Sequence, residues 1–306
     1  MNRRGFWGDV RKYRTLLLML APAVLFFLVF AYVPMAGIVL AFKQYNYGGG
    51  IFGSPWNGLD NFRFFFESGN AWMVTRNTAL YNIAFIIVNN VLQIAAAILL
   101  FEAVGKWFRK ISQTFMFLPY FISWVVVGAI AYNLFNYDVG TLNVMLTAIG
   151  LEPVDIYNTP SYWPFILVLV SAWKTLGYGS VMYLAAITGI DTEMYEAAEI
   201  DGANVFQRIF RITIPNLYPT LIILALLAIG NIFRGDFGMF YNMVGNNGLL
   251  FSATDVIDTF VFRSLTTSNE IGLSAAAGFY QSVLGFATIL LANYAVRKYD
   301  KDHALF

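Results

Sequence analysis

Few residues of this chain could carry out covalent chemistry. The 306 residues include no cysteine and a single histidine, His303. This composition excludes a thiolate or multi-histidine metal site and a histidine-based catalytic triad. ATP hydrolysis would need a phosphate-binding Gly-x-x-x-x-Gly-Lys-[Ser/Thr] loop, but the single Gly-Lys pair, at Gly105, is followed by Trp107. We therefore expect a chain that is not an enzyme, does not hydrolyse ATP by itself and binds no cofactor or metal ion.

The remaining chemical candidates are polar residues inside long apolar stretches, where a charge is costly and is by default functional. Lys174 lies beside aromatic residues in the stretch 162–187, and glycines surround Arg234 and Asp236 in the stretch 217–241. These glycines indicate a locally irregular helix, which a membrane tolerates where it lines a cavity or is buried in protein. The candidates for a substrate pathway are Asn231, Arg234, Asp236, Tyr280, Gln281 and Lys174.

Structural roles are the alternatives for these residues. Arg234 and Asp236 could form an ion pair with each other or contact a partner, and for Lys174 we favour a buried hydrogen bond or a snorkelling side chain. Tyr280 and Gln281 could be helix–helix contacts. If the substrate were acidic, Arg234 or Arg263 could pair with its carboxylates.

A second group of candidates lies in the segment 188–216, which holds five of the 18 acidic residues. Asp191 is typical of a helix cap, with acidic residues following in the first turn. Gly202 can supply a positive φ where one short helix ends and another begins. Phe206 and Phe210 are spaced to form an apolar knob on one face of the second helix. On spacing alone, a helix pair resting on lipid stays open beside a protein-docking loop.

The elements that position these residues are membrane helices. Of the sequence, 58% is hydrophobic and 12% is charged, about half the charge of a soluble domain. A membrane-spanning helix needs about 20 apolar residues. We predict an all-α, polytopic membrane protein with six spans, at residues 15–42, 78–101, 114–135, 162–187, 217–241 and 273–296.

The distribution of Lys and Arg predicts the orientation of these spans. Thirteen of the 19 basic residues lie in the N-terminus, the second-to-third connection, the segment 188–216 and the C-terminus. Basic residues favour the cytoplasmic side, so both termini are expected to be cytoplasmic. A net charge of +1 argues against nucleic acid as a partner.

The segment 188–216 carries a recognisable pattern. Glu-Ala-Ala, three residues, Gly, nine residues and Ile-x-Leu-Pro is the signature of permease subunits in binding-protein-dependent ABC importers of the maltose type. Ile214 stands in place of the leucine, a change that conserves volume. The chain therefore resembles that family, and its coupling residues would be Glu196, Ala197, Ala198, Asp201, Gly202, Phe206, Ile212 and Pro215.

The resemblance implies a type I ABC importer permease fold and a set of partners. The segments 58–62, 77–78 and 173–177 look like the carbohydrate branch, and 293–298 with 304–306 is similar to the subgroup that imports oligosaccharides and polysaccharide fragments. The expected partners are a second, homologous but non-identical permease, two ATPase subunits that bind ATP and Mg, an external solute-binding protein, an oligosaccharide and the lipid bilayer. The expected location is the bacterial cytoplasmic membrane.

In that family the short helix of the loop docks on an ATPase as a coupling helix. Glu196 would make a polar contact, Ala197 and Ala198 would permit close approach, and Gly202 would form the bend. To these residues we add Phe206 and Phe210, which would anchor the loop by packing against the ATPase or against span ends of this chain.

We divide the chain into four parts on this basis. They are 1–42 (N-terminus and first span), 43–76 (external loop), 77–296 (permease core) and 297–306 (cytoplasmic tail). In the external loop, residues 59–67 are either a helix at the membrane surface or a folded loop that packs aromatics on span ends. A polyol or glycerol-phosphate substrate and, less favoured, an ion-coupled secondary transporter remain alternatives.

Overall fold

The structure is a computed structural model that describes residues 12–103 and 105–299. The regular elements in these ranges are helices, and one isolated antiparallel bridge joins Lys43 to Trp56. The prediction of an all-α protein is confirmed. His303 and four of the eight N-terminal and C-terminal basic residues lie outside the described ranges, so the orientation of the termini stays a prediction.

The membrane-spanning helices match the predicted pattern in number, with one of them broken. Five helical segments are long and apolar enough to cross a bilayer, and the two parts of a sixth are bent by 92° relative to each other. The five are Arg14–Phe42, Asn70–Glu102 (α5), Pro160–Thr188, Val205–Gly230 and Ile271–Lys298, and the bent pair is Lys106–Phe121 with Trp124–Phe135.

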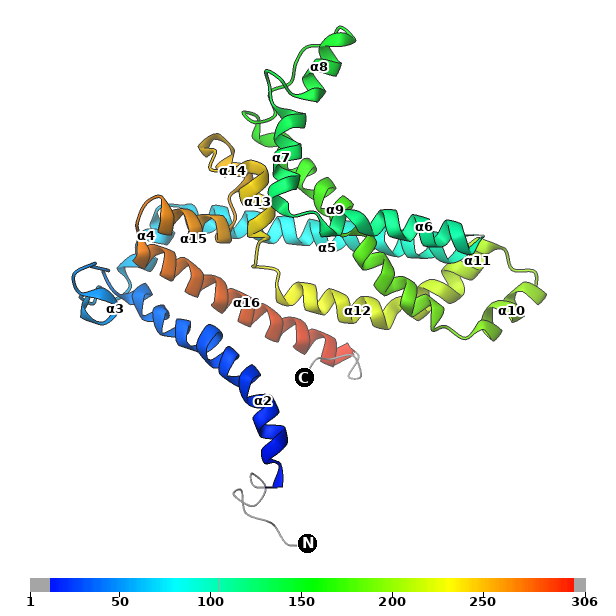
Figure 1. The fold of residues 1–306 in the computed structure, drawn as a ribbon, viewed down its shortest axis with the longest axis horizontal. Coiled ribbons are helices and arrows are strands. Elements are labelled where there is room, and N and C mark those ends of the chain that lie inside the picture. Colours follow the sequence, from blue (N-terminus) through cyan, green and yellow to red (C-terminus); the bar gives the residue numbers. More distant parts are fainter. Residues whose placement is uncertain (1–11, 104, 300–306) are drawn as a thin grey trace.

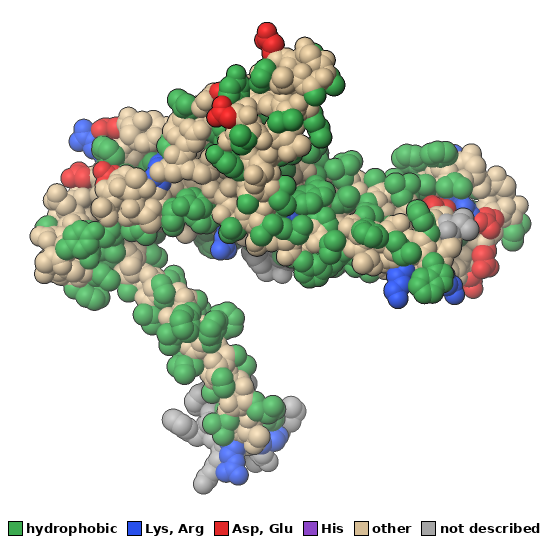
Figure 2. All heavy atoms as spheres, turned by 45° about the horizontal axis from the view of Figure 1, so that its top comes forward, with side chains coloured by type: hydrophobic (Ala, Val, Ile, Leu, Met, Phe, Trp, Pro, Cys, Tyr) green, Lys and Arg blue, Asp and Glu red, His purple; other side chains and the backbone are tan. Residues whose placement is uncertain are grey.

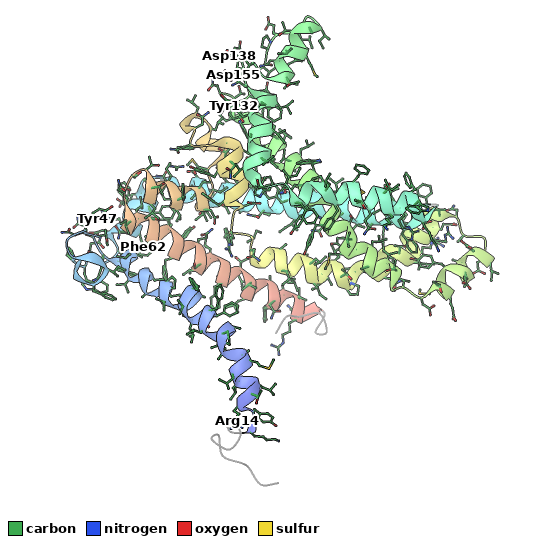
Figure 3. The ribbon with its side chains drawn as sticks, in the orientation of Figure 1. Arg14, Tyr47, Phe62, Tyr132, Asp138 and Asp155 are labelled. Atoms are coloured by element: carbon green, nitrogen blue, oxygen red, sulfur yellow. The ribbon has the colours of Figure 1, made fainter. Side chains whose placement is uncertain are left out.

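The first span stands apart from the others. It consists of α2 (Arg14–Phe27), a π-helical turn (Leu28–Tyr32) and a tighter 3₁₀ stretch (Val33–Phe42). Pro22 inside α2 and Pro34 at the start of the 3₁₀ stretch account for the change of winding. No residue of α2 is buried, and α2 leads away from the remaining helices, with Arg14 at its free end (Figure 1, Figure 3).

The third span is broken at its middle. It comprises α6 (Lys106–Phe117), a 3₁₀ turn (Leu118–Phe121) and α7 (Trp124–Phe135). Ser123 caps α7 by accepting a hydrogen bond from Val126 N at 3.4 Å. The chain therefore starts a new helix in a new direction at this point, and α7 and α8 (Thr141–Ala148) protrude from the long helices (Figure 1).

The fifth span ends earlier than predicted. Its helix α12 (Ile214–Gly230) stops eleven residues before position 241, and a separate helix α13 (Phe237–Val244) follows after a non-helical turn. Asp236 starts α13 by accepting a hydrogen bond from Met239 N at 3.1 Å. The prediction of a continuous span over 217–241 is wrong, whereas the local irregularity that the glycines indicated is present.

The external loop folds against the first turns of α5, against α16 and against the short helix between the last two spans. Residues 60–67 form α4 (Asp60–Glu67), in which Phe65 is fully buried. Its ring lies 5.3 Å from that of Phe260 in α15 (Ile257–Thr266) and 5.6 Å from that of Tyr280 in α16 (Ile271–Tyr299). Of the two alternatives for this segment, the structure favours aromatics packed on span ends.

Tight packing of small and aromatic residues joins the remaining helices. α5 lies along α9 (Trp163–Thr188), and a Cβ at Gly179 of α9 would overlap the Gln93 side chain of α5. α12 packs on α16, where Gly230 meets Ile289. Hydrophobic side chains cover much of the outer surface of these helices (Figure 2), as lipid contact requires. Two short helices complete the described fold: α3 is Gly50–Gly53 and α14 is Phe251–Thr254. A 3₁₀ turn precedes each of α9 (Pro160–Tyr162) and α14 (Gly248–Leu250).

Candidate functional site

The loop between α9 and α12 folds into two short helices joined at a glycine. α10 (Thr192–Ile200) begins at Asp191, which accepts a hydrogen bond from Glu193 N at 3.0 Å. Gly202 follows α10 with a φ of +76°, a conformation that glycine adopts without strain. α11 (Val205–Arg208) then begins. The helix cap and the glycine bend predicted from the sequence are both confirmed.

This loop presents an exposed surface of mixed chemistry. No residue of α10 is buried, and Glu196 and Ala197 are exposed. Ile200, Phe206 and Phe210 are exposed by 87%, 73% and 65%. Acidic and basic side chains gather around these apolar ones at the same end of the molecule (Figure 2). Because both phenylalanine rings are exposed, they do not pack on span ends of this chain. Their contact with the ATPase stays a prediction.

A hollow of about 350 Å³ lies beside the glycine bend. Its lining combines Asp201 and Gly202 after α10 with Gln207, Arg208 and Arg211 of the following helices. Ala198, Ala203 and Ile212 complete it. Four of the eight predicted coupling residues, Ala198, Asp201, Gly202 and Ile212, therefore share one concave surface, whereas Glu196, Ala197, Phe206 and Pro215 do not line it. Nothing in the structure shows what binds there.

The end of the loop is continuous with the fifth span. A π-helical turn (Ile209–Thr213) carries Ile212, and Pro215 is the second residue of α12. Because the helical winding is continuous from Val205 to Gly230, the missing N–H of Pro215 falls inside the helix, directly after the π-helical turn. The Tyr195 hydroxyl of α10 lies 3.0 Å from Thr213 Oγ1, which ties the first short helix to the start of the span.

Lys174 has a structural environment. Its side chain is 8% exposed, and Nζ donates hydrogen bonds to the carbonyl oxygens of Pro119 (3.2 Å), Tyr120 (3.1 Å) and Ile122. These carbonyls lie at the break in the third span, where regular helical pairing ends, and Pro119 O also accepts a hydrogen bond from Ile122 N at 3.1 Å. Of the buried hydrogen bond and the snorkelling side chain expected for Lys174, the structure supports the buried hydrogen bond.

Two of the predicted pathway residues line a cavity between α5, α9 and α12, whose walls combine apolar side chains with several amides. Asn231 and Arg234 are at one end of this cavity of about 360 Å³, and Asn89 and Gln93 of α5 face it further along. Tyr178 adds an aromatic face that stacks on Tyr120 with ring centroids 4.7 Å apart. Polar side chains and an aromatic ring in one cavity suit a hydroxylated ligand.

A second cavity, of about 500 Å³, lies between α12 and α16 and shares Asn231 and Arg234 with the first. Gln281 donates through Nε2 to Asp258 Oδ2 at 2.8 Å, and Gly235 N donates to the same oxygen at 2.6 Å. Burial raises the pKa of Asp258, which lies in α15 outside the spans. Nothing in the sequence pattern singled out Asp258, because its approach to Gln281 depends on the packing of α15 on α16.

Asp236 and Tyr280, also predicted for the pathway, have structural contacts. Asp236 caps α13 and so lies outside a span. The Tyr280 hydroxyl is 3.1 Å from Thr75 Oγ1, and its ring packs on Phe65. The predicted Arg234–Asp236 ion pair is not among the ion pairs of the described residues.

Comparison with known proteins decides the family. The family described as "Binding-protein-dependent transport system inner membrane component" matches residues 89–301. The chain belongs to this family. The match includes the loop with its Glu196–Pro215 signature, the cavity between α12 and α16, the last four helical spans and residues 89–102 at the end of α5.

Relatives within the family extend over nearly the whole chain. Protein LplB of Bacillus subtilis (strain 168) is 33% identical over 97% of this chain and 93% of its own length. The polygalacturonan/rhamnogalacturonan transport system permease protein YteP of the same organism is 30% identical over 95% of this chain and 90% of its length. The arabinooligosaccharide permease AraP of Halalkalibacterium halodurans is 28% identical over 92% of this chain.

Solved structures confirm the fold. A chain of a bacterial ABC transporter involved in the import of the acidic polysaccharide alginate superposes with a TM-score of 0.87, at 31% identity, over 96% of this chain and 99% of that chain. The same transporter has been solved in complex with an alginate pentasaccharide-bound periplasmic protein. The family membership confirms the predictions of a type I ABC permease fold, a multi-pass bacterial membrane protein and a permease subunit of a sugar-importing ABC transporter.

Proposed function

We propose that this chain forms half of the translocation pathway of an ATP-driven importer for oligosaccharides, with uronate-containing fragments as its substrate class. The observation that carries the proposal is the exposed α10–α11 loop, which presents Glu196, Ala197 and the Gly202 bend. This loop and α4 of the external loop lie at opposite ends of the long helices (Figure 1).

In this role the loop receives mechanical work from a separate ATPase, and this chain performs no catalysis of its own. ATP and Mg bind to the ATPase, whose closure displaces α10 and rotates the permease as a rigid body. A second, non-identical permease supplies the other half of the pathway, and an external solute-binding protein delivers the saccharide. The complex of the alginate transporter with its periplasmic protein supports this last partner.

The substrate class rests on Arg234 and on the relatives. Arg234 is exposed and lines both cavities, that between α5, α9 and α12 and that between α12 and α16. It has no carboxylate within ion-pair distance in the described part of the chain. A guanidinium in this setting is available to a sugar carboxylate, with which it forms strong charge-assisted hydrogen bonds. Two of the relatives are named for acidic polysaccharides or their fragments.

The experiment is an uptake assay with the complete complex in proteoliposomes, supplied with its binding protein and ATP. Unsaturated oligogalacturonides and oligomannuronates are compared with neutral arabino- and malto-oligosaccharides of the same length. The proposal predicts ATP-dependent uptake of at least one uronate series. Uptake of the neutral series alone would contradict the substrate class, and uptake of small polyols alone would contradict the oligosaccharide pathway.

A further inference from the structure

Arg208 lies between two carboxylates that belong to different parts of the molecule. Its guanidinium pairs through Nη1 with Glu199 of α10, and Nη2 lies 3.6 Å from Oε2 of Glu102, the last residue of α5. The side chains of Arg208 and Glu102 are only 14% and 23% exposed. Water therefore screens the Arg208–Glu102 pair less than it screens a surface ion pair.

A second contact joins the same two helices. The ring of Tyr195 in α10 lies 5.6 Å from that of Phe101, the neighbour of Glu102. Phe101 in turn packs on the apolar cluster that contains Tyr183 of α9 and Leu217 of α12. α10 is therefore fastened to the C-terminal end of α5, called here its inner end. The fastening consists of the ion pairs through Arg208 and of the aromatic contact between Tyr195 and Phe101.

Helix α5, to which α10 is fastened, also lines the cavity between α5, α9 and α12. Gln93 lies nine residues before Glu102, about 13 Å along a helix with a rise of 1.5 Å per residue. It donates through Nε2 to the Thr175 carbonyl at 3.2 Å, within the cavity between α5, α9 and α12. Because a continuous helix moves as a rigid element, a displacement of Glu102 is transmitted to the cavity.

We propose that Arg208 is a positioning residue of energy coupling: it holds α10 against the inner end of α5, so that a displaced α10 moves the helix that lines the cavity. This proposal rests on the function proposed above. Glu102 is the essential partner of Arg208 in this role, since Glu199 belongs to the moving helix itself. Without the guanidinium, Glu102 and Glu199 face each other as like charges, and α10 separates from α5.

The first test measures saccharide imported per ATP hydrolysed by the complete complex carrying Arg208→Gln. We expect this ratio to fall about tenfold, within the usual range for coupling between sites, while the ATPase still co-purifies. Lys110→Gln is the matched control, because Lys110 of α6 is exposed, lies outside the hollow and forms no ion pair in the described part of the chain. An equal ratio in Arg208→Gln, Lys110→Gln and the wild type would overturn the proposal.

A double-mutant cycle assigns the effect to the Glu102 contact. Glu102→Gln alone is expected to lower the ratio in the same direction, and the double variant is expected to be no worse than Arg208→Gln. Additive losses would overturn the pairing. Arg208→Lys keeps the charge, so partial recovery of the ratio is expected, which a role in packing alone would not produce.

A distance measurement tests the attachment without transport. The chain has no native cysteine, so spin labels can be placed at Leu99→Cys on α5 and Glu193→Cys on α10, both exposed positions. We expect one narrow distance distribution that Arg208→Gln broadens and Lys110→Gln leaves unchanged. An unchanged distribution in Arg208→Gln would overturn the proposal. A wild-type complex that imports no saccharide would instead contradict the proposed function, and the label distances would still decide whether Arg208 holds α10.

Discussion

The guanidinium of Arg263 holds the carboxylate of Asp255 in a two-point ion pair, with Nη1–Oδ1 and Nη2–Oδ2 distances of 3.0 and 2.5 Å. The Asp255 side chain is 1% exposed, and its backbone carbonyl accepts a hydrogen bond from Asn77 of α5 at 3.1 Å. This pair fixes the start of α15 against α5. It also occupies Arg263, which leaves Arg234 as the candidate for binding an acidic sugar.

Removing the cation of this pair should destabilise the protein. Arg263→Gln leaves a buried carboxylate without its counter-ion, for which we expect a loss of about 3 kcal/mol. The matched control is Arg63→Gln, whose pair with Glu67 is exposed on both sides and contributes about 0.5 kcal/mol. The measurement is the apparent Tm of the purified complex in detergent. Equal Tm shifts in the two variants would show that burial does not strengthen the Arg263 pair.

Gly202 provides a test of the bend after α10. Its φ of +76° is incompatible with proline, whose ring fixes φ near −65°, so Gly202→Pro should abolish most substrate-stimulated ATP hydrolysis without preventing membrane insertion. Gly202→Asn is the matched control, because asparagine tolerates a positive φ and a Cβ at this position meets no neighbour. Full activity of the proline variant would contradict the role of the bend in coupling.

Arg234 should determine the preference for acidic saccharides. Arg234→Gln removes a charge-assisted contact worth about 1.4 kcal/mol or more, which is tenfold in apparent affinity. We expect initial uptake rates to fall for oligogalacturonides at low concentration and to stay constant for any neutral oligosaccharide that is transported. Arg234→Lys keeps the charge and should retain part of the activity. A uniform loss across all substrates would indicate a structural role for Arg234.

The buried carboxylate of Asp258 should make stability depend on pH. Because burial raises its pKa in the folded protein, the folded state holds the proton more tightly than the unfolded state does. As the pH rises through the folded pKa, the buried group ionises and the wild type loses stability relative to a neutral side chain. The Tm of Asp258→Asn minus that of the wild type should therefore increase as the pH rises above about 4, the ordinary pKa of an aspartate. A Tm difference that does not change with pH would contradict a raised pKa of Asp258 in the folded protein.

The spans and the loop signature could be predicted from the sequence because both depend on local features. Apolar length specifies a membrane helix, and the Asp191 cap and the Gly202 bend depend on the residues themselves. The end of α12 was harder to predict, since Asn231 to Asp236 are surrounded by apolar residues and only the Asp236 cap reveals that a new helix begins there.

The partners of the buried charges could not be read from the sequence. Lys174 reaches carbonyls more than fifty residues away, and Arg208 reaches Glu102 across the packing of the loop on α5. These contacts depend on how the helices assemble, which hydrophobic periodicity does not encode. The same holds for Asp258 and Gln281, which meet only where α15 lies on α16.

The central claim is that this chain passes the work of a separate ATPase to a saccharide pathway through its α10–α11 loop. The most direct test is to purify the tagged chain from the cell membrane and to measure ATP hydrolysis with and without a saccharide-loaded binding protein. The account predicts that an ATPase and a second permease co-purify and that the loaded binding protein stimulates hydrolysis. Recovery of the chain alone, with saccharide uptake driven by an ion gradient, would contradict it.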